Sequence, residues 1–241
     1  MPIVTWAKDE TAAILTMNNG ENRQNLDFAN AMNAVLDEIL SDASVHAIVL
    51  TSSDEKNFSQ GVDVQWIMTR MQAKETQAIK DFLYGMNGVF KRLLTAPVPV
   101  IAAINGHAYG NGAMLSCACD FRFMKSDRGF FCFPEVNIGI PFLYGMNAFV
   151  KKAIPYHKFI EMQFTGNRYA APELERHNII VKACANAEEL MKESISFAKT
   201  FVKKRGIFGE MKKRMYRDIL EIMDSVDPNE TIEPLKIFIP D

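Results

Sequence analysis

The feature that most constrains the fold is an apolar run followed directly by a glycine-rich turn. Residues 98–104 are apolar throughout, which is typical of a buried strand. The turn, residues 105–112, carries three glycines, and residues 113–119 then predict a helix that is buried on nearly every side. A dinucleotide fingerprint is excluded, because Leu115 stands where G-x-G-x-x-G requires its third glycine. Since a strand, a tight turn and a helix start leave backbone N–H groups unpaired, the stretch predicts an anion-binding position.

The same alternation of strand and helix runs through the first half of the chain. Two apolar runs, residues 12–17 and 45–51, predict strands, and amphipathic periodicity predicts helices over residues 27–40 and 75–94. The continuous apolarity of residues 45–51 suits a parallel sheet that is covered on both faces. This order favours an α/β fold with right-handed crossovers.

The second part of the chain, from Leu143 onward, has a different pattern. Only helical segments are recognisable there, in residues 148–154, 156–164, 170–177, 187–204 and 210–223. The sequence pattern therefore predicts an α/β core followed by a helical appendage.

Composition and charge exclude several classes of protein. The 241 residues carry a formal net charge of -2, which gives no reason to expect nucleic acid as a partner. No run approaches the ~18 apolar residues of a membrane span, and the N-terminus lacks the pattern of a secretory signal, so we expect a cytoplasmic protein. The four cysteines form no C-x-x-C pair, and we expect neither a metal site nor a disulfide.

One carboxylate, Glu135, stands within an otherwise apolar segment, residues 133–139. A second glycine turn, residues 59–62, also follows a strand pattern, so each turn can aim one N–H, from Val62 and Asn111, at a single carbonyl oxygen. Two such donors and one buried base make a site for enolate chemistry. Taken singly, each feature has a plainer interpretation: the turn connects a strand to a helix, and the carboxylate caps a helix or forms a salt bridge.

Five motifs, in this order and spacing, resemble the crotonase (enoyl-CoA hydratase/isomerase) superfamily. They are Asn25-Leu26 before an amphipathic helix, Phe58-Ser59-Gln60-Gly61-Val62-Asp63, Asn105-Gly106-His107-Ala108, Cys119-Asp120-Phe121-Arg122 and Pro134-Glu135-Val136-Asn137-Ile138-Gly139. The resemblance covers residues 6–204. It implies a crotonase-like spiral of ββα units over residues 1–186, which carries the acyl-CoA site. It also implies a C-terminal helical region over residues 187–241 that joins protomers into a homo-trimer or hexamer. Residues 58–63 and 126–131 look most like the monofunctional Δ3,Δ2-enoyl-CoA isomerases of fatty acid breakdown.

The resemblance also implies roles for individual residues. The amides of Val62 and Asn111 would form an oxyanion hole for the thioester carbonyl, and Glu135 would carry a proton from C2 to C4 of a 3-enoyl-CoA. Coenzyme A is part of this substrate, so no separate cofactor is expected. The residues expected to bind the substrate are Arg23, Asn25, Ser59, Gly61, Asp63, Trp66, Gly110, Met114, Pro134 and Phe142. The apolar neighbours expected to bury Glu135 and raise its pKa are Phe131, Phe133, Val136 and Ile138.

The chain departs from the family's hydratases at two positions. Those enzymes use a second glutamate, which falls here on Met114, and a thioether can neither take nor give a proton. Asn111 replaces a glycine common in the hydratases, so its side chain either crowds the thioester or hydrogen-bonds to it. The alternatives to an isomerase are an enoyl-CoA hydratase or thioester hydrolase that uses Glu135 alone, and a catalytically silent acyl-CoA-binding subunit.

Two further features of the substrate site depend on the folded chain. The acyl chain length is expected to depend on the packing of Met114, Trp66, Phe142 and Leu143. The basic clusters at residues 203–205 and 212–214, with Arg217, either meet the phosphates of coenzyme A or form solvent-exposed helix faces.

Overall fold

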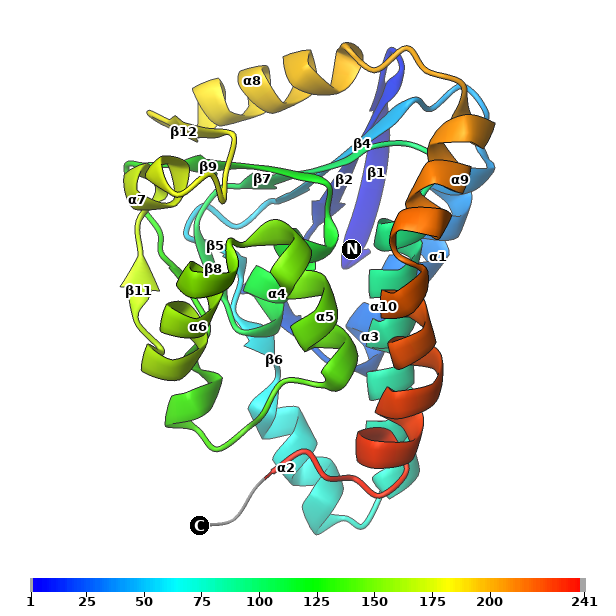
Figure 1. Ribbon diagram of the computed structural model, residues 1–241, viewed down its shortest axis with the longest axis vertical. Helices are drawn as coiled ribbons and strands as arrows, with labels where there is room; N and C mark the ends of the chain where they lie inside the picture. The colour runs from blue at the N-terminus through cyan, green and yellow to red at the C-terminus, as the bar shows by residue number, and fades with distance from the viewer. Residues whose placement is uncertain (1, 239–241) are drawn as a thin grey trace.

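The computed structural model describes residues 2–238 and is built around one six-stranded sheet (Figure 1). The strand order is β1-β2-β4-β7-β9-β12. The first two strands pair antiparallel as a hairpin, and every later pair is parallel. The strands are β1 Val4–Asp9, β2 Ala12–Met17, β4 Ala47–Ser52, β7 Val100–Ile104, β9 Phe121–Lys125 and β12 Lys182–Cys184.

Helices cover both faces of this sheet, which explains why β4 is buried at every position. Ile48 and Leu50 point into the core shared with α1 (Leu26–Ser41) and α3 (Thr76–Thr95). Ala47 and Val49 point to the opposite face, into a smaller core shared with α8 (Ala187–Lys199). Successive side chains of β4 thus lie alternately in two separate cores.

Two small sheets hold the glycine turns. One has the order β11-β10-β8-β5 and comprises Arg168–Tyr169, Phe131–Cys132, His107–Tyr109 and Asn57–Ser59. The other pairs β3 (Arg23–Gln24) with β6 (Gly61–Val62). Beside them lies α4 (Asn111–Ala118), whose residues are all buried, so the predicted buried helix is confirmed.

The remaining elements are helical and surround this centre. In Figure 1, α9 and α10 form a column beside α3 that continues through two π-helical turns. Their bounds are α2 Val64–Gln72, a 3-10 turn Pro134–Asn137, α5 Tyr144–Ala153, α6 Tyr156–Thr165, α7 Ala171–Arg176, α9 Arg205–Met215, α10 Arg217–Glu221, and the π-helical turns Ile222–Val226 and Pro228–Ile232.

The α/β class is confirmed, but the prediction that only helices follow Leu143 is wrong. β11 and β12 both lie in that part and complete two different sheets. Strands of two or three residues are too short to show a period of two, so the sequence pattern does not reveal them. The helix α8, which begins at the predicted boundary, packs against β4, β7 and β9. The predicted contacts of this helical region with other protomers stay a prediction.

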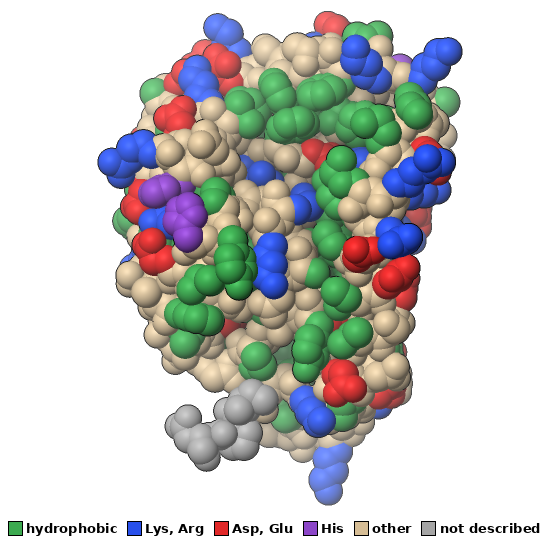
Figure 2. All heavy atoms as spheres, in the orientation of Figure 1, with side chains coloured by type: hydrophobic (Ala, Val, Ile, Leu, Met, Phe, Trp, Pro, Cys, Tyr) green, Lys and Arg blue, Asp and Glu red, His purple; other side chains and the backbone are tan. Residues whose placement is uncertain are grey.

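Apolar side chains gather on the face shown in Figure 2, beneath α8 and along the column of α9 and α10. The exposed ones on or next to α9 are Val202, Ile207, Met211 and Met215. Among the described residues, no helix combines the length and apolarity needed to cross a membrane.

Candidate active site

The two glycine turns predicted from the sequence lie directly against each other. A Cβ atom on Gly61 would lie 2.6 Å from the carbonyl oxygen of Tyr109 and 3.1 Å from the amide nitrogen of Asn111. A Cβ atom on Gly112 would lie 2.4 Å from the carbonyl oxygen of Ser59. Both positions therefore require glycine, and their close approach brings Val62 and Asn111 to the wall of one cavity.

A buried chain of hydrogen bonds ties the turns together. The Asn111 Nδ2 group donates to Gln24 Oε1 at 2.6 Å, and Gln24 Nε2 donates to Ser59 Oγ at 3.1 Å. The Ser59 hydroxyl also accepts the Gly61 N–H at 3.1 Å and donates to the carbonyl oxygen of Asn22 at 2.7 Å. These bonds hold the two turns at a fixed separation.

These hydrogen bonds show how the side chains of Ser59 and Asn111 are used within the protein. Ser59 is fully buried, and its hydroxyl positions the Gly61 turn; its expected role in binding the substrate stays a prediction. The Asn111 Nδ2 group is already paired with Gln24, and the effect of this side chain on the thioester also stays a prediction. Gln24 itself was missed, because a lone glutamine between two polar residues carries no sequence signal.

The cavity between the turns and the surrounding helices has a volume of about 80 Å³. Its walls are apolar except for Asn111 and Glu135. The lining residues are Val62, Val64, Ile67, Phe82, Leu83, Met86, Asn111, Met114, Glu135, Ile140, Pro141, Phe142, Leu143, Met146, Ile237 and Phe238. Among residues 2–238, Glu135 is the one titratable side chain in this lining.

Glu135 lies on the 3-10 turn that follows β10, and its side chain faces Gly110. Its Oε1 atom is 2.8 Å from the position a Cβ would take on Gly110, which leaves room for hydrogen alone. Its Oε2 atom is buried and has no hydrogen-bond partner in the described part of the chain, nor does Glu135 form a salt bridge there. Burial raises the pKa of Glu135 from its ordinary value of 4.5 to about 7.

The expected burial of Glu135 is confirmed, but two of the neighbours named for it are wrong. Val136 and Ile138 are 53% and 52% exposed, because successive residues of a tight 3-10 turn point in different directions. The apolar side chains that share the cavity with Glu135 come instead from Met114, Phe142 and the helices α2, α3 and α5.

Several residues predicted to bind the substrate lie outside this cavity. Asn25 and Asp63 cap α1 and α2 by accepting the N–H groups of Phe28 and Trp66 at 3.1 and 3.0 Å. Arg23 is exposed and pairs with Glu21 at 3.0 Å, while Pro134 begins the 3-10 turn that carries Glu135. Their contacts with coenzyme A stay predictions.

The residues that line the cavity differ in two ways from those expected to determine the acyl chain length. Trp66 packs edge-on against Phe82, with the two ring centroids 5.7 Å apart, and does not line the cavity. Helix α3 and the C-terminal residues Ile237 and Phe238 do line it, although no motif pointed to them. Met114, Phe142 and Leu143 line the cavity as expected.

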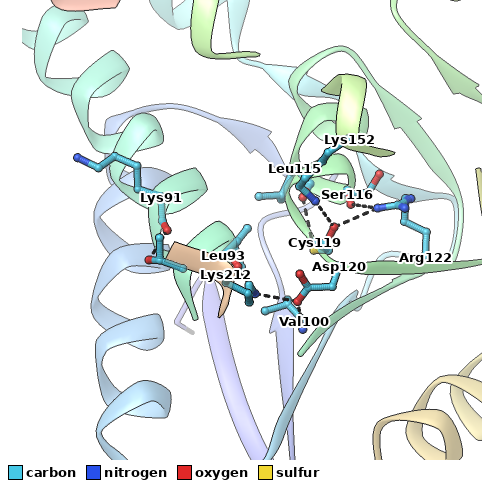
Figure 3. Close-up of polar contacts among 11 residues, drawn as sticks. Lys91, Leu93, Val100, Leu115, Ser116, Cys119, Asp120, Arg122, Lys152 and Lys212 are labelled. Atoms are coloured by element: carbon cyan, nitrogen blue, oxygen red, sulfur yellow. Dashed lines mark hydrogen bonds and ion pairs between the residues drawn. The ribbon is translucent and has the colours of Figure 1, made fainter. Parts of the chain in front are cut away.

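Two members of the basic clusters have structural roles that neither interpretation anticipated. Arg205 donates to the carbonyl oxygens of Leu40, Asp42 and Val45 at the end of α1. Lys212 is buried and donates to the carbonyl oxygen of Leu93 and to Asp120 Oδ2, at 3.0 and 2.8 Å (Figure 3).

Figure 3 also shows cationic groups at the carboxyl end of α4, the helix whose first residue is Asn111. Arg122 donates to the carbonyl oxygens of Ser116 and Cys119, and Lys152 donates to that of Cys119 at 2.8 Å. Positive charge at this end complements the helix dipole and fixes the helix that presents the Asn111 amide.

All four cysteines are buried free thiols, and burial raises the pKa of each. No group of three or more histidine, cysteine or carboxylate side chains suited to a metal ion occurs within residues 2–238.

Comparisons with known proteins agree with this geometry. A model of the family described as "Enoyl-CoA hydratase/isomerase" matches residues 7–225. The chain is 30% identical over 215 residues to a short-chain-enoyl-CoA hydratase of Clostridium acetobutylicum, covering 88% of this chain and 79% of that protein. It is 26% identical over 211 residues to the peroxisomal enoyl-CoA delta isomerase 2 of Arabidopsis thaliana, covering 85% and 88%.

Solved structures share the fold. An enoyl-CoA hydratase of Bacillus halodurans superposes with a TM-score of 0.86 at 21% identity, covering 97% of this chain and 95% of that one. A Mycobacterium tuberculosis protein, described as an enoyl-CoA isomerase in one solved structure and as a probable enoyl-CoA hydratase in another, superposes in the first with a TM-score of 0.84 at 22% identity, covering 97% and 99%. The chain has the crotonase fold, and it belongs to the enoyl-CoA hydratase/isomerase family.

Proposed function

We propose that the protein isomerises 3-enoyl-CoA thioesters to trans-2-enoyl-CoA with Glu135 as its single base. One observation carries this proposal. Glu135 is the one titratable side chain among the described residues that line the cavity, and it shares that cavity with Val62, Asn111 and Met114. A shift of a double bond needs one group that first takes a proton and then returns it, which a single carboxyl group can do.

The reaction begins at C2 of the bound thioester. The Glu135 carboxylate removes a C2 proton, and the electron pair of that C–H bond moves toward the thioester oxygen to form a dienolate. The amides of Val62 and Asn111 stabilise the charge on this oxygen; one such donor is worth ~3 kcal/mol in other enzymes. The protonated Glu135 then gives the proton to C4, and the double bond comes to lie between C2 and C3.

The raised pKa of Glu135 suits both steps. A carboxyl group with its ordinary pKa is nearly always ionised at neutral pH and is a weak acid catalyst in the second step. With a pKa of about 7, ionised and protonated forms have similar free energies near neutral pH, so neither proton transfer is strongly uphill for the carboxyl group.

An enoyl-CoA hydratase is the leading alternative, because relatives with both names match the chain at similar identity. Hydration requires that water be positioned and activated beside the double bond. In this cavity Met114 occupies the position where the family's hydratases carry a second glutamate, and its thioether cannot activate water. The remaining alternatives are a thioester hydrolase and a silent acyl-CoA-binding subunit.

The deciding experiment measures conjugated-enoyl absorbance after purified protein is mixed with 3-hexenoyl-CoA. We expect the absorbance to rise with the wild type and the rate to fall by about 10³-fold or more in Glu135→Gln, which keeps the shape but removes the base. Crotonyl-CoA, already conjugated, tests hydration in parallel, since hydration lowers the absorbance.

Met114→Glu is the matched variant for the alternative. We expect this change to add hydration of crotonyl-CoA that the wild type lacks. A wild type that hydrates crotonyl-CoA faster than it converts 3-hexenoyl-CoA would contradict the isomerase proposal. Binding of thioesters without either reaction would support the silent subunit.

A further inference from the structure

The last described residues of the chain form one wall of the cavity that contains Glu135. Beyond the π-helical turn Pro228–Ile232, residues 233–238, here called the tail, leave the helical column and cross α2 in Figure 1. Ile237 is 9% exposed, and Phe238 is partly buried against the main core. Both side chains line the same cavity as Val64 of α2.

The direction of the tail is set by a turn and by contacts with α3. Leu235 adopts a φ of +52°, a conformation that costs a non-glycine residue about 1 kcal/mol or more and that ends helices. The Lys236 N–H closes this turn on the carbonyl oxygen of Thr231 at 2.9 Å. Glu233 is held by Lys80 Nζ and the Tyr84 hydroxyl, each at 2.7 Å. The tail is thus directed back over the cavity.

The cavity enclosed with the help of this wall is small. Its volume is about 80 Å³, whereas an engineered apolar cavity of about 150 Å³ is needed to take up benzene. The other walls are formed by α2, α3, α4, Met146 of α5 and the loop 140–143, whose Phe142 and Leu143 belong to the core. The tail and this loop are the walls without regular secondary structure, and the tail's polar anchor through Glu233 is exposed and therefore weak.

We propose that Ile237 and Phe238 set the upper limit on acyl chain length and restrict the site to short-chain thioesters. Because the cavity has about half the volume of one that takes up benzene, only short acyl chains fit with the tail in place. A ten-carbon chain has to displace Ile237 and Phe238 from apolar contacts, at a cost in affinity. The assignment of acyl-CoA as ligand rests on the proposed function.

Saturated thioesters provide the test, because their binding does not depend on isomerisation. Calorimetry measures the affinity of the full-length protein for butyryl-, hexanoyl- and decanoyl-CoA. We expect the wild type to bind decanoyl-CoA about tenfold more weakly than hexanoyl-CoA, and Ile237→Ala and Phe238→Ala each to remove most of that difference. Phe238→Trp, which enlarges the wall without opening it, should weaken hexanoyl-CoA more than butyryl-CoA.

Phe164→Ala is the matched control, because Phe164 is 69% exposed and does not line the cavity. It lines a neighbouring, more open hollow that shares Glu135 and residues 140–142 with the cavity. This variant should keep the chain-length profile of the wild type. Equal affinity of the wild type for hexanoyl- and decanoyl-CoA would overturn the inference, as would equal profiles for Phe238→Ala, Phe238→Trp and Phe164→Ala. A wild type with the expected binding profile but no conversion of 3-hexenoyl-CoA would refute the isomerase proposal and leave the tail's role intact.

Discussion

Substitution of Gly110 is expected to displace the Glu135 carboxylate while leaving Glu135 itself unchanged. Gly110 adopts a φ of +52°, and a methyl group added there would lie 2.8 Å from Glu135 Oε1, against at least 3.4 Å for an ordinary contact. The carboxylate therefore has to move by about 0.6 Å in Gly110→Ala, because the backbone of Gly110 is anchored to the carbonyl oxygen of Cys132 at 2.9 Å. Since a misplacement of about 1 Å costs ~100-fold in rate, we expect kcat to fall by about 10- to 100-fold.

Gly20→Ala is the control, because it adds a methyl group at a positive φ where no neighbouring atom is in contact. The φ of Gly20 is +53°, and a methyl group added there would meet no atom within 4 Å. Gly20→Ala should therefore lose about 1–2 kcal/mol of unfolding free energy. Gly110→Ala should lose more, because its ψ of -122° lies outside the left-handed helical region. The loss of rate should be confined to Gly110→Ala. Urea unfolding and the conversion of 3-hexenoyl-CoA measure the two effects on the same preparations.

Two results would refute this reasoning. The first is a Gly110→Ala variant whose kcat stays within about threefold of the wild type, which would show that the position of the Glu135 carboxylate does not limit the reaction. The second is an equal loss of rate in Gly20→Ala, which would attribute the effect to general destabilisation.

Five more predictions concern Glu135, Asn111, Lys212 and the exposed apolar face of α9. Because Glu135 must be ionised to act as base, kcat/KM should fall about tenfold per pH unit below pH ~7. Folding raises the pKa of Glu135 from 4.5 to about 7, so the folded chain holds this proton to higher pH than the unfolded chain. Stability should therefore fall by about 3 kcal/mol as the pH rises from 4.5 to 7, and urea unfolding of Glu135→Gln should lack that contribution. Asn111→Ala leaves Gln24 Oε1 without its donor and should cost about 1–3 kcal/mol in urea unfolding. It should change kcat by less than about threefold, because the proposed donor to substrate is the backbone amide. Lys212→Met removes the ammonium group from Asp120, which keeps the Val100 N–H as a hydrogen-bond donor, and should cost about 1.5–3 kcal/mol, whereas Lys213→Met on the exposed face should stay within about 0.5 kcal/mol; thermal unfolding compares the two. Finally, light scattering should give the mass of a trimer or hexamer, and a glutamate at each exposed apolar position of α9 should lower it.

Much of the central architecture follows from local patterns. The strand Ala12–Met17 and the helices α1 and α3 agree with their predicted ranges to within one residue. Long amphipathic helices and continuous apolar strands are the elements whose periodicity is strongest. By contrast, β10, β11 and β12 span only two or three residues, and pairing with distant segments is what makes them strands.

The candidate site likewise combines features that are visible in the sequence with features that depend on tertiary contacts. Sequence spacing marked Glu135, Val62 and Asn111 as members of one site, because glycine turns and a lone carboxylate in an apolar segment are visible along the chain. The position of Gln24 between the turns, the exposure of Val136, and the buried role of Lys212 depend on neighbours 35 to 92 residues away or on the local turn. Such contacts leave no periodic trace in the sequence.

The sequence by itself determined the fold class, the two turns and the choice of Glu135 as candidate base, since each depends on residue type and short-range order. Tertiary structure decided what surrounds Glu135. It aligned Gly110 against the carboxylate, left Glu135 Oε2 without a hydrogen-bond partner among residues 2–238, and brought Ile237 and Phe238 to the wall of the cavity. The pKa of Glu135 and the volume left for an acyl chain are properties of that enclosure, because desolvation and packing arise only when distant segments close around the same space.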